Sequence, residues 1–289
     1  MESKTGRKRS KAKQACHIVL SMQHHAMVFS LNDSCTIIVM QNECREDTTD
    51  GAVVKLPRKG LYRQRAHCNP LTDVHFDVPT KPADIDWSEH FPELYEQAKE
   101  NNEAGPKVDF VDIGCGFGGM TITLAREFPD KLTVGMEIRA KVSQYVKDRI
   151  IALRKKEPGK YRNASCIRTN TMKHLVQYFE KGQLEKMLFL FPDPQFKTTK
   201  HRRRIIQTTL LDEYAYVMKS GGVLYTITDV EDLAIWMREK LEKHPLFELI
   251  SDAELAQDPV ATFIETMTEE GQKVKRNGGQ TWKAIFRRR

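Results

Sequence analysis

The sequence predicts an α/β fold, with a mostly parallel sheet of seven strands covered by helices on both faces. Two observations lead to this prediction. Short apolar segments alternate along the chain with segments whose apolar residues recur at helical spacing. The first apolar segment also runs directly into a glycine-rich turn and then into a helix, an arrangement typical of α/β folds that bind nucleotide-containing ligands.

Each predicted strand is a short apolar run. The strands are expected near 108–113, 132–137, 165–168, 186–191, 223–228, 246–250 and 281–286. Helices between strands are expected within 120–128, 142–153, 206–218 and 233–241. The first of these helices ends at Pro129, the second at Pro158 and the third at Gly221, because proline and glycine disrupt helices. An earlier helix opens within residues 86–95, with Ser88 as its expected N-cap.

Length and composition limit the class of protein. A chain of 289 residues can bury one substantial core. A net charge of +7 and a pI near 9.0 suit a polyanionic partner such as nucleic acid. The six cysteines form no C-x-x-C pair and no spacing typical of zinc, so reduced thiols and no metal site are expected.

Residues 1–59 differ from the rest of the chain, and we expect them to be a disordered basic extension of a single domain at 60–289. Residues 6–13 are a basic run of the kind found in nuclear addresses. Residues 14–32 lack charged side chains, but polar residues interrupt them, so no membrane span and no membrane partner are expected. A weak targeting peptide and a gene-model artefact upstream of the true start remain alternative explanations.

The glycine turn contains Gly114, Gly116, Gly118 and Gly119, which let a ligand approach the backbone. Three of them satisfy G-x-G-x-x-G, so a dinucleotide cofactor is one interpretation. Asp112, two residues earlier, would place negative charge near a pyrophosphate, whereas a sulfonium cofactor tolerates it.

Glu137 ends the next strand, 23 residues after Gly114, where an acid can bind both ribose hydroxyls. NAD and S-adenosylmethionine share this ribose, so Glu137 does not distinguish them. Cys115 lies inside the turn with no base beside it in sequence, so a small packing residue is expected there rather than a nucleophile.

The loop after the fourth strand carries the most distinctive motif. In Phe191-Pro-Asp-Pro194, two prolines fix the backbone around Asp193 and hold its carboxylate at the carboxyl edge of the sheet. Residues 197–204 follow with five formal positive charges in eight residues. Cations at a helix N-terminus oppose the helix dipole, so this run favours phosphate contacts over a merely solvated surface.

The motifs together resemble the tRNA (guanine-N7-)-methyltransferase family in its eukaryotic form. The segments that carry the resemblance are Tyr62-Arg-Gln-Arg-Ala-His67, Asp112-Ile-Gly-Cys-Gly, Glu137-Ile-Arg139, Phe191-Pro-Asp-Pro-Gln-Phe-Lys197, Gly221-Gly, Thr268-Glu-Glu-Gly271 and Arg276-Asn-Gly-Gly with Ala-Ile-Phe-Arg287. They run in the family's order from about Leu61 to Arg288. The resemblance implies a class I methyltransferase fold, Rossmann-like, that uses S-adenosylmethionine and no metal.

The resemblance also implies roles for matching residues. Asp193 is the residue usually called catalytic. The cofactor-binding positions are Gly114 for the methionine part, Glu137 for the ribose, Ile138 and Arg139 beside the adenosine, Asn170 and Thr171 at the adenine, Leu190, and the late loop Thr268, Glu269 and Glu270. Thr171 stands where the family has Ala, which leaves one packing detail open. Gln195 stands where the family often has His and keeps the Pro-Asp-Pro turn.

The substrate implied by the resemblance is guanine 46 of the tRNA variable loop, converted to 7-methylguanosine. The expected RNA-binding residues are Lys197, Lys200, Arg202, Arg203, Arg204, Arg63 and Arg65, together with the tail Arg287–Arg289. Phe196 is expected either to stack on a base or to plug the core. The resemblance further implies a heterodimer with a non-catalytic WD-repeat propeller subunit. The basic run 6–13 predicts a location in the nucleus, with the cytoplasm as a second location.

Three other functions stay open at this point. The literal glycine match supports an NAD-dependent oxidoreductase. The basic run is also consistent with an RNA-binding module that has lost catalysis. A methylase of small molecules or proteins fits the glycine turn, although the basic run argues against it.

Overall fold

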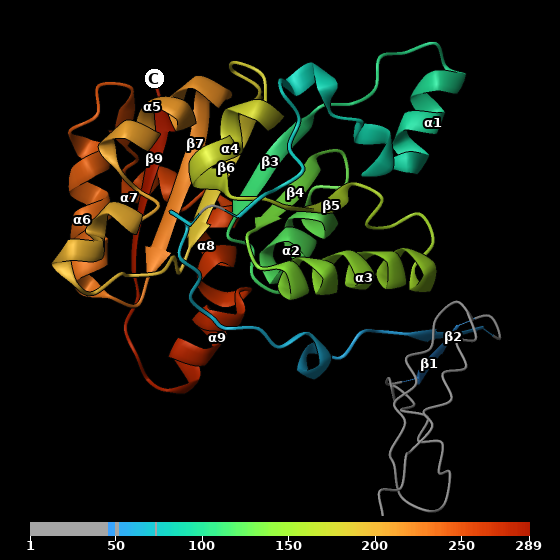
Figure 1. The fold of residues 1–289 in the computed structure, drawn as a ribbon, viewed down its shortest axis with the longest axis horizontal. Coiled ribbons are helices and arrows are strands. Elements are labelled where there is room, and N and C mark those ends of the chain that lie inside the picture. Colours follow the sequence, from blue (N-terminus) through green and yellow to red (C-terminus); the bar gives the residue numbers. More distant parts are fainter. Residues whose placement is uncertain (1–45, 50–51, 73) are drawn as a thin grey trace, which may run out of the picture. The chain divides into compact units, whose positions relative to one another are not determined.

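The computed structural model describes residues 46–49, 52–72 and 74–289 (Figure 1). The chain divides into two units, 1–43 and 44–289, and every described residue belongs to the second. The basic run 6–13 and the weakly apolar stretch 14–32 lie outside the described residues. Within the expected extension, β1 (Glu46–Thr49) and β2 (Ala52–Lys55) form an antiparallel pair. Among the described residues, no helix combines the length and the apolar character needed to span a bilayer.

A seven-stranded sheet forms the centre of the domain, in the order β5-β4-β3-β6-β7-β9-β8 (Figure 1). Its strands are β3 (Val108–Ile113), β4 (Leu132–Glu137), β5 (Ala164–Arg168), β6 (Leu184–Leu190), β7 (Met218–Thr228), β8 (Phe247–Leu249) and β9 (Trp282–Arg288). The strands β3 to β7 pair in parallel, and β9 runs antiparallel to both β7 and β8. The predicted mostly parallel, seven-stranded α/β fold is therefore confirmed.

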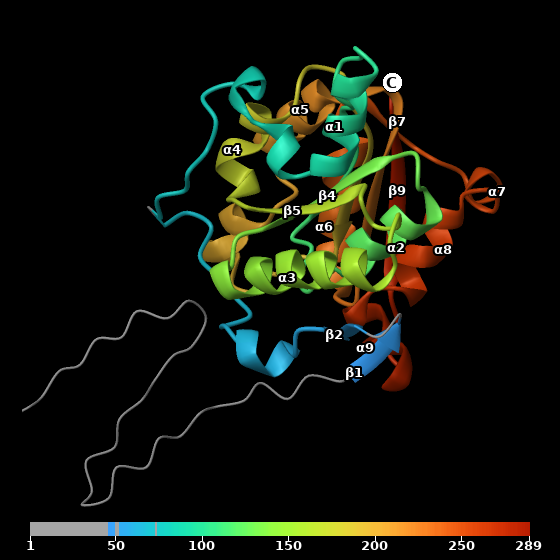
Figure 2. The ribbon, with the colours of Figure 1, turned by 90° about the vertical axis from the view of Figure 1, so that its right-hand side faces the viewer.

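Helices cover both faces because the buried strands are apolar on both sides. The helices are α1 (Pro92–Glu100), α2 (Gly119–Glu127), α3 (Ala140–Lys156), α4 (Thr171–Tyr178), α5 (Thr208–Val217), α6 (Glu231–Glu242), α7 (Asp252–Leu255), α8 (Pro259–Thr266) and α9 (Glu269–Arg276). In β3, Val111 and Ile113 pack in the cluster that contains residues of α4, α5 and α6. Phe110 points to the opposite face, where α2 and α8 pack. On that face α3 also covers β5 (Figure 2).

Two local predictions are wrong. Ser88 does not cap the first helix, because residues 87–89 form a separate 3-10 turn that Asp86 caps by accepting from the Ser88 amide at 2.9 Å. Helix α1 begins only at Pro92, since proline suits a first helical position that needs no N–H donor. Met218 was expected in a helix, yet it begins β7 opposite Leu184.

The parallel register brings five strand ends to one edge of the sheet. Ile113 of β3 lies opposite Met136 of β4 and Phe189 of β6, and Glu137 lies opposite Arg168 of β5. The loops that follow these strands therefore converge, as expected for ligand sites in open α/β sheets.

Candidate active site

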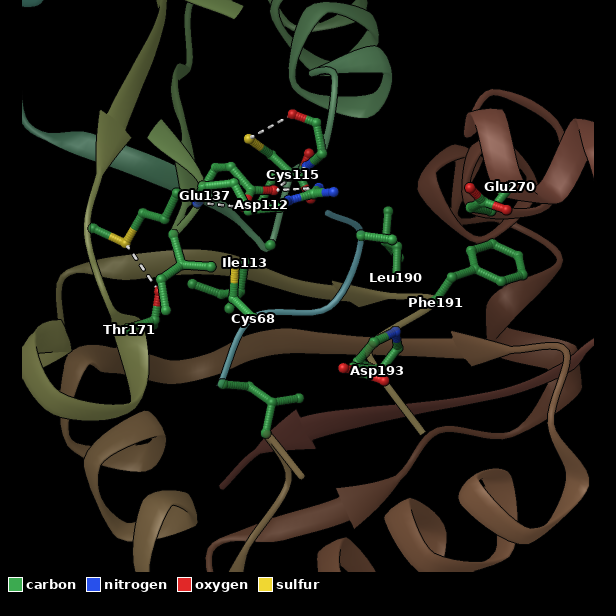
Figure 3. Close-up of a pocket in the computed structure, with 18 of the residues that line it drawn as sticks. Cys68, Asp112, Ile113, Cys115, Glu137, Thr171, Leu190, Phe191, Asp193 and Glu270 are labelled. Carbon is green, nitrogen blue, oxygen red and sulfur yellow. Dashed lines mark hydrogen bonds and ion pairs between the residues drawn. The ribbon is translucent and has the colours of Figure 1, made fainter. Parts of the chain in front are cut away.

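A cavity of about 550 Å³ lies beyond the carboxyl ends of β3, β4, β5 and β6 (Figure 3). It gathers every residue that was predicted to bind the cofactor, together with the predicted catalytic residue. These are Gly114, Glu137, Ile138, Arg139, Asn170, Thr171, Leu190, Asp193, Thr268, Glu269 and Glu270. The last three lie at the start of α9, where Thr268 caps the helix by accepting from the Gly271 amide at 3.0 Å.

The glycine turn needs glycine because of its backbone. Gly114, Gly116 and Gly118 have φ values of 71°, 55° and 73°, in the left-handed region. A Cβ on Gly118 would lie 2.7 Å from Val146 Cγ1, whereas a Cβ on Gly114 would meet nothing within 4 Å. Gly114 therefore borders the open cavity, and Gly118 packs against α3.

The amides of this turn are already engaged inside the chain. The N–H groups of Gly114 and Cys115 both donate to the Met136 carbonyl, at 2.8 and 3.1 Å. The Gly116 N–H donates to Glu137 Oε2 at 3.1 Å. These three amides do not form a free anion-binding nest, which argues against a pyrophosphate at the turn.

Replacing Gly114 by alanine should abolish cofactor binding while lowering the free energy of unfolding only modestly. An L-residue in the left-handed region costs about 1–2 kcal/mol, and the new methyl group enters the cavity. Gly159→Ala is the matched control, because Gly159 has φ 83° and open space but lies in a loop outside the cavity. Calorimetric titration with S-adenosylhomocysteine should show lost affinity only for Gly114→Ala. Equal affinity of the two variants would contradict a cofactor role for the turn.

Glu137 is buried, with 3% of its surface exposed, and its carboxylate accepts four hydrogen bonds. In addition to Gly116, Arg139 donates three, from its backbone N and from Nε to Oε1 and from Nη2 to Oε2, each at 2.9 Å. This pairing raises the pKa of the Arg139 guanidinium. Glu137 and Arg139 therefore form one neutralised unit on the wall of the cavity.

Asp112 is a buried acid beneath the glycine turn, 2% exposed, and accepts from Thr121 Oγ1 at 2.8 Å. Burial raises the pKa of its carboxyl from the usual 3.8 to about 6, although the Thr121 hydrogen bond acts in the opposite direction. At pH 7 the carboxyl is therefore mostly ionised and contributes negative charge beneath the turn.

The raised pKa of Asp112 predicts a pH-dependent stability difference. Between pH 3.8 and about 6 the native state binds more protons at this group than the unfolded state, so stability falls as pH rises through that window. Asp112→Asn should therefore increase the free energy of unfolding by up to roughly 3 kcal/mol above pH 7, with a gain that shrinks toward pH 4. Urea denaturation from pH 4 to 8 measures it. A gain that does not vary with pH would contradict the assignment.

Cys115 does not have the environment of a nucleophile. A hydrogen bond with Cys166 and burial raise the pKa of its thiol well above the usual range. A Cβ on the neighbouring Gly135 would lie 2.7 Å from the Cys115 sulfur, so the thiol fills a tightly packed site. The expectation of a small packing residue is supported, and the described cysteines Cys68, Cys115 and Cys166 are all free thiols.

Asp193 stands on the loop after β6, with 31% of its side chain exposed (Figure 3). Its Oδ2 contacts His67 Nδ1 at 3.1 Å and accepts from Gln195 Nε2 at 2.8 Å. Phe191 and Gln195 flank the Pro-Asp-Pro turn with φ values of 51° and 48°. Left-handed backbone at two non-glycine residues is costly and typical of functional sites.

Residues 62–70, called the arm below, precede α1 and close part of the cavity. The sequence did not indicate this position. His67, Cys68 and Pro70 line the cavity, and Asn170 Nδ2 donates to the Pro70 carbonyl at 2.6 Å. Sequence reasoning assigned this arm to RNA alone, from the arginines of residues 62–67. The prolines that follow those arginines keep the arm extended, but no local pattern indicates which part of the sheet it crosses.

The predicted RNA-binding residues separate into three groups. Five are exposed on the arm or on the 3-10 helix 198–203 and its flanks, namely Arg63, Arg65, Lys197, Lys200 and Arg202. Arg203 is half-buried and lines the cavity, and its Nε is buried without a partner among the described residues. Arg204 is only 1% exposed, so its prediction as a phosphate contact is wrong.

The C-terminal tail 287–289 lies away from the cavity. β9 runs antiparallel to β7, with Arg287 opposite Val223. The tail therefore lies near the amino ends of the parallel strands, whereas the cavity lies beyond their carboxyl ends. Arg287 Nη2 contacts Glu254 at 2.9 Å, and Arg289 Nε contacts Glu248 at 3.2 Å. Phe196, in contrast, is 74% exposed beside the Pro-Asp-Pro turn, so it does not plug the core.

Across 46–49, 52–72 and 74–289, no group of three or more His, Cys, Asp or Glu side chains could hold a metal ion. Acidic residues nevertheless outnumber basic ones around the cavity. The acids are Asp112, Glu137, Asp193, Asp229, Glu269 and Glu270, and the cations are Arg139, Arg203 and Lys273. The cavity therefore favours a cationic small ligand over a polyanionic one.

Comparison with known proteins agrees with this geometry. A family model described as "Putative methyltransferase" matches residues 106–284. The tRNA (guanine-N(7)-)-methyltransferase of Oryza sativa subsp. indica is 58% identical over 238 residues, which cover 81% of this chain and 92% of the relative. The enzyme of the same name from Brugia malayi is 53% identical over 245 residues, 84% of this chain and 92% of the relative.

Among solved structures, the 16S rRNA methyltransferase KamB matches with a TM-score of 0.46 and 13% identity, over 73% of this chain and 99% of that chain. The fold assignment depends on the strand order and the family model, not on this match. Because the Oryza sativa and Brugia malayi relatives are more than half identical to this chain over most of its length, the chain belongs to the tRNA (guanine-N(7)-)-methyltransferase family, and it has the class I methyltransferase fold.

Proposed function

We propose that this enzyme transfers a methyl group from S-adenosylmethionine to N7 of guanine 46 in the variable loop of tRNA, forming 7-methylguanosine. One observation carries the proposal. A single cavity contains the glycine turn, the buried acid Glu137 and the partly exposed carboxylate of Asp193. A methyl donor and a guanine can therefore meet in one space, with exposed cations beside it for an RNA backbone.

The residues of the cavity fit S-adenosylmethionine better than a dinucleotide. When bound, this cofactor supplies a methyl group on a positively charged sulfur. Asp112 is mostly ionised at pH 7 and lies beneath the turn, where it favours positive charge and disfavours a pyrophosphate. The open space at Gly114 leaves room for the methionine part.

Glu137 would hold the ribose. A carboxylate offers about four acceptor positions, and Gly116 and Arg139 occupy all four here. A ribose diol therefore has to displace the Arg139 side chain, while the two backbone donors stay and orient the carboxylate. Asn170 and Thr171, at the start of α4, would flank the adenine with Ile138.

Methyl transfer to guanine N7 requires no general base. The in-plane lone pair of N7 forms the new N–C bond as the S–C bond breaks, the electron pair of that bond remains on sulfur, and no proton moves. The protein has to hold the reacting atoms about 3–3.5 Å apart and in line. Asp193 accepts hydrogen bonds from guanine N1–H and the exocyclic amine, which selects guanine and stabilises the cationic product.

Both contacts that Asp193 makes among the described residues fall on Oδ2, so Oδ1 is available to a guanine. The exposed cations Lys197, Lys200 and Arg202 would bind phosphates beside it. Arg203 lines the cavity and its Nε has no partner among the described residues, so its guanidinium would reach a phosphate at the rim. Phe196 is exposed enough to stack on a base.

The proposal includes a second subunit and a location. A non-catalytic WD-repeat propeller protein would form a heterodimer with this chain and help to hold the tRNA, and the enzyme would act in the nucleus. The resemblance of this chain to the eukaryotic form of the family supports the second subunit, and the basic run 6–13 supports the nuclear location. Co-purification from nuclear extract and activity with and without the propeller subunit test them.

Nucleoside mass spectrometry of tRNA incubated with the enzyme and S-adenosylmethionine tests the reaction. The proposal predicts 7-methylguanosine at a single position in the variable loop. tRNA binding without any methylated product would favour an RNA-binding module. A thermal shift with NADH but none with S-adenosylhomocysteine would favour an oxidoreductase.

A further inference from the structure

The Pro-Asp-Pro turn is anchored at both ends. Before it, the Phe191 N–H donates to the carbonyl of Ile227 in β7 at 2.8 Å. After it, the Pro194 carbonyl accepts from Arg204 Nε at 2.9 Å. Asp193 lies between these two anchors, so whatever holds the Pro194 carbonyl also restricts the carboxylate.

Arg204 is an unusual residue to find in this position. Its side chain is 1% exposed, its guanidinium lies over the Trp236 ring at 4.9 Å, and Nη2 contacts Asp232 at 2.5 Å. Nη1 is buried without a partner in the described part of the chain. Burying a charge without full compensation is unfavourable, and hydrophobic replacements of such groups are often neutral or stabilising. A requirement other than stability would explain why an arginine occupies this site.

The backbone around Arg204 is fixed to the body of the domain. Trp236 Nε1 donates to the Ile206 carbonyl at 2.8 Å, and Tyr214 OH donates to the Ile205 carbonyl at 2.8 Å. Both donors come from helices, α6 and α5, that pack on the central sheet. Arg204 therefore reaches Pro194 from a rigid support and not from a surface loop.

A short chain of contacts leads from Arg204 to the carboxylate. The Pro194 carbonyl sets the plane of the peptide bond that joins Pro194 to Gln195. Gln195 has a left-handed φ of 48°, and this conformation lets its side chain turn back so that Nε2 donates to Asp193 Oδ2 at 2.8 Å. If the Pro194 carbonyl rotated, Gln195 would lose this contact and Asp193 would lose its orientation.

We propose that Arg204 is a positioning residue for methyl transfer, which orients Asp193 through the Pro194 carbonyl and Gln195 and does not contact RNA. The proposal depends on the role of Asp193 in the proposed function. It also explains why Arg204 is buried although the other four cations of residues 197–204 are exposed or line the cavity.

Arg204→Lys tests the proposal, because lysine keeps the charge but lacks the planar fork that serves Pro194 and Asp232 together. Single-turnover methyl transfer to tRNA, at saturating tRNA and cofactor and per folded enzyme, should fall roughly tenfold or more, as expected for a misplaced reacting geometry. The KM for tRNA and the affinity for S-adenosylhomocysteine should stay within about twofold. Arg238→Lys, in an exposed pair with Glu242 on α6, is the matched control and should leave all three values unchanged.

Two other results for Arg204→Lys would overturn the proposal. A raised KM with an unchanged saturating rate would overturn the proposal in favour of a phosphate contact. A lower melting temperature with an unchanged rate per folded enzyme would overturn it in favour of a purely structural role. If Arg204→Lys does not fold, Asp232→Asn decides, since Asp232 is 69% exposed and the change is mild. A rate about threefold lower at unchanged KM supports the proposal, and an unchanged rate overturns it. Absence of methyl transfer by the unmodified enzyme would instead overturn the proposed function.

Discussion

Replacing Asp193 by asparagine is expected to lower the rate of methyl transfer to tRNA by roughly 10²–10³-fold, the range found when one preorganised electrostatic contact is lost. Asparagine keeps the shape of the side chain but loses the negative charge that stabilises the cationic product. Its amide also presents a donor toward guanine N1–H, which is itself a donor. The Pro-Asp-Pro backbone remains, so the fold and the cofactor site should be unaffected.

Single-turnover assays with labelled cofactor measure this loss, and gel-shift titration shows whether tRNA binding persists. We expect the dissociation constant for tRNA to change by less than threefold, because the exposed cations that bind phosphates are untouched. Asp130→Asn, in the exposed turn between α2 and β4, is the control and should have no effect. A variant at Asp193 that retained full activity would remove this residue from the mechanism.

Replacing Glu137 by glutamine is expected to weaken cofactor binding by about 10- to 100-fold, because hydrogen bonds from the ribose to a charged acceptor are lost. The same change leaves the half-buried Arg139 without its ion-pair partner. Breaking such a pair from one side typically costs about 3 kcal/mol or more, so the free energy of unfolding should fall as well. Calorimetric titration and urea denaturation separate the two effects.

A second substitution distinguishes ribose binding from stability. Adding Arg139→Met to the Glu137 variant removes the unpaired cation, so stability should recover in part while cofactor affinity stays low. Glu157→Gln serves as the control, since Glu157 pairs with Lys160 on the surface and its loss should cost less than about 1 kcal/mol. Recovery of affinity in the double variant would show that Glu137 does not contact the ribose.

The fold could be predicted from the sequence because its signals are local. Apolar runs of strand length alternate with helical stripes, and this pattern alone implied a mostly parallel sheet with its ligand site at the carboxyl ends. Residues at those ends, such as Gly114, Glu137 and Asp193, could be named before their positions were known. The structure places all of them on one cavity.

Other features could not be predicted from the sequence, because they depend on contacts between residues that lie far apart in the chain. Arg202 and Arg204 belong to the same basic run, yet Arg202 is exposed and Arg204 is buried against Trp236, which lies later in the chain on α6. The arginines of the tail end at the far edge of the sheet because β9 runs antiparallel to β7, and strand direction leaves no trace in the residues of one strand. The contact of His67 with Asp193 likewise joins segments that share no local pattern.

The most direct test of the central claim is a crystal structure of the enzyme with S-adenosylhomocysteine. The claim predicts the ribose on Glu137, the Arg139 side chain displaced, and the homocysteine part beside Gly114 with its sulfur open toward Asp193. A ligand bound outside this cavity, or a sulfur that faces away from Asp193, would contradict it.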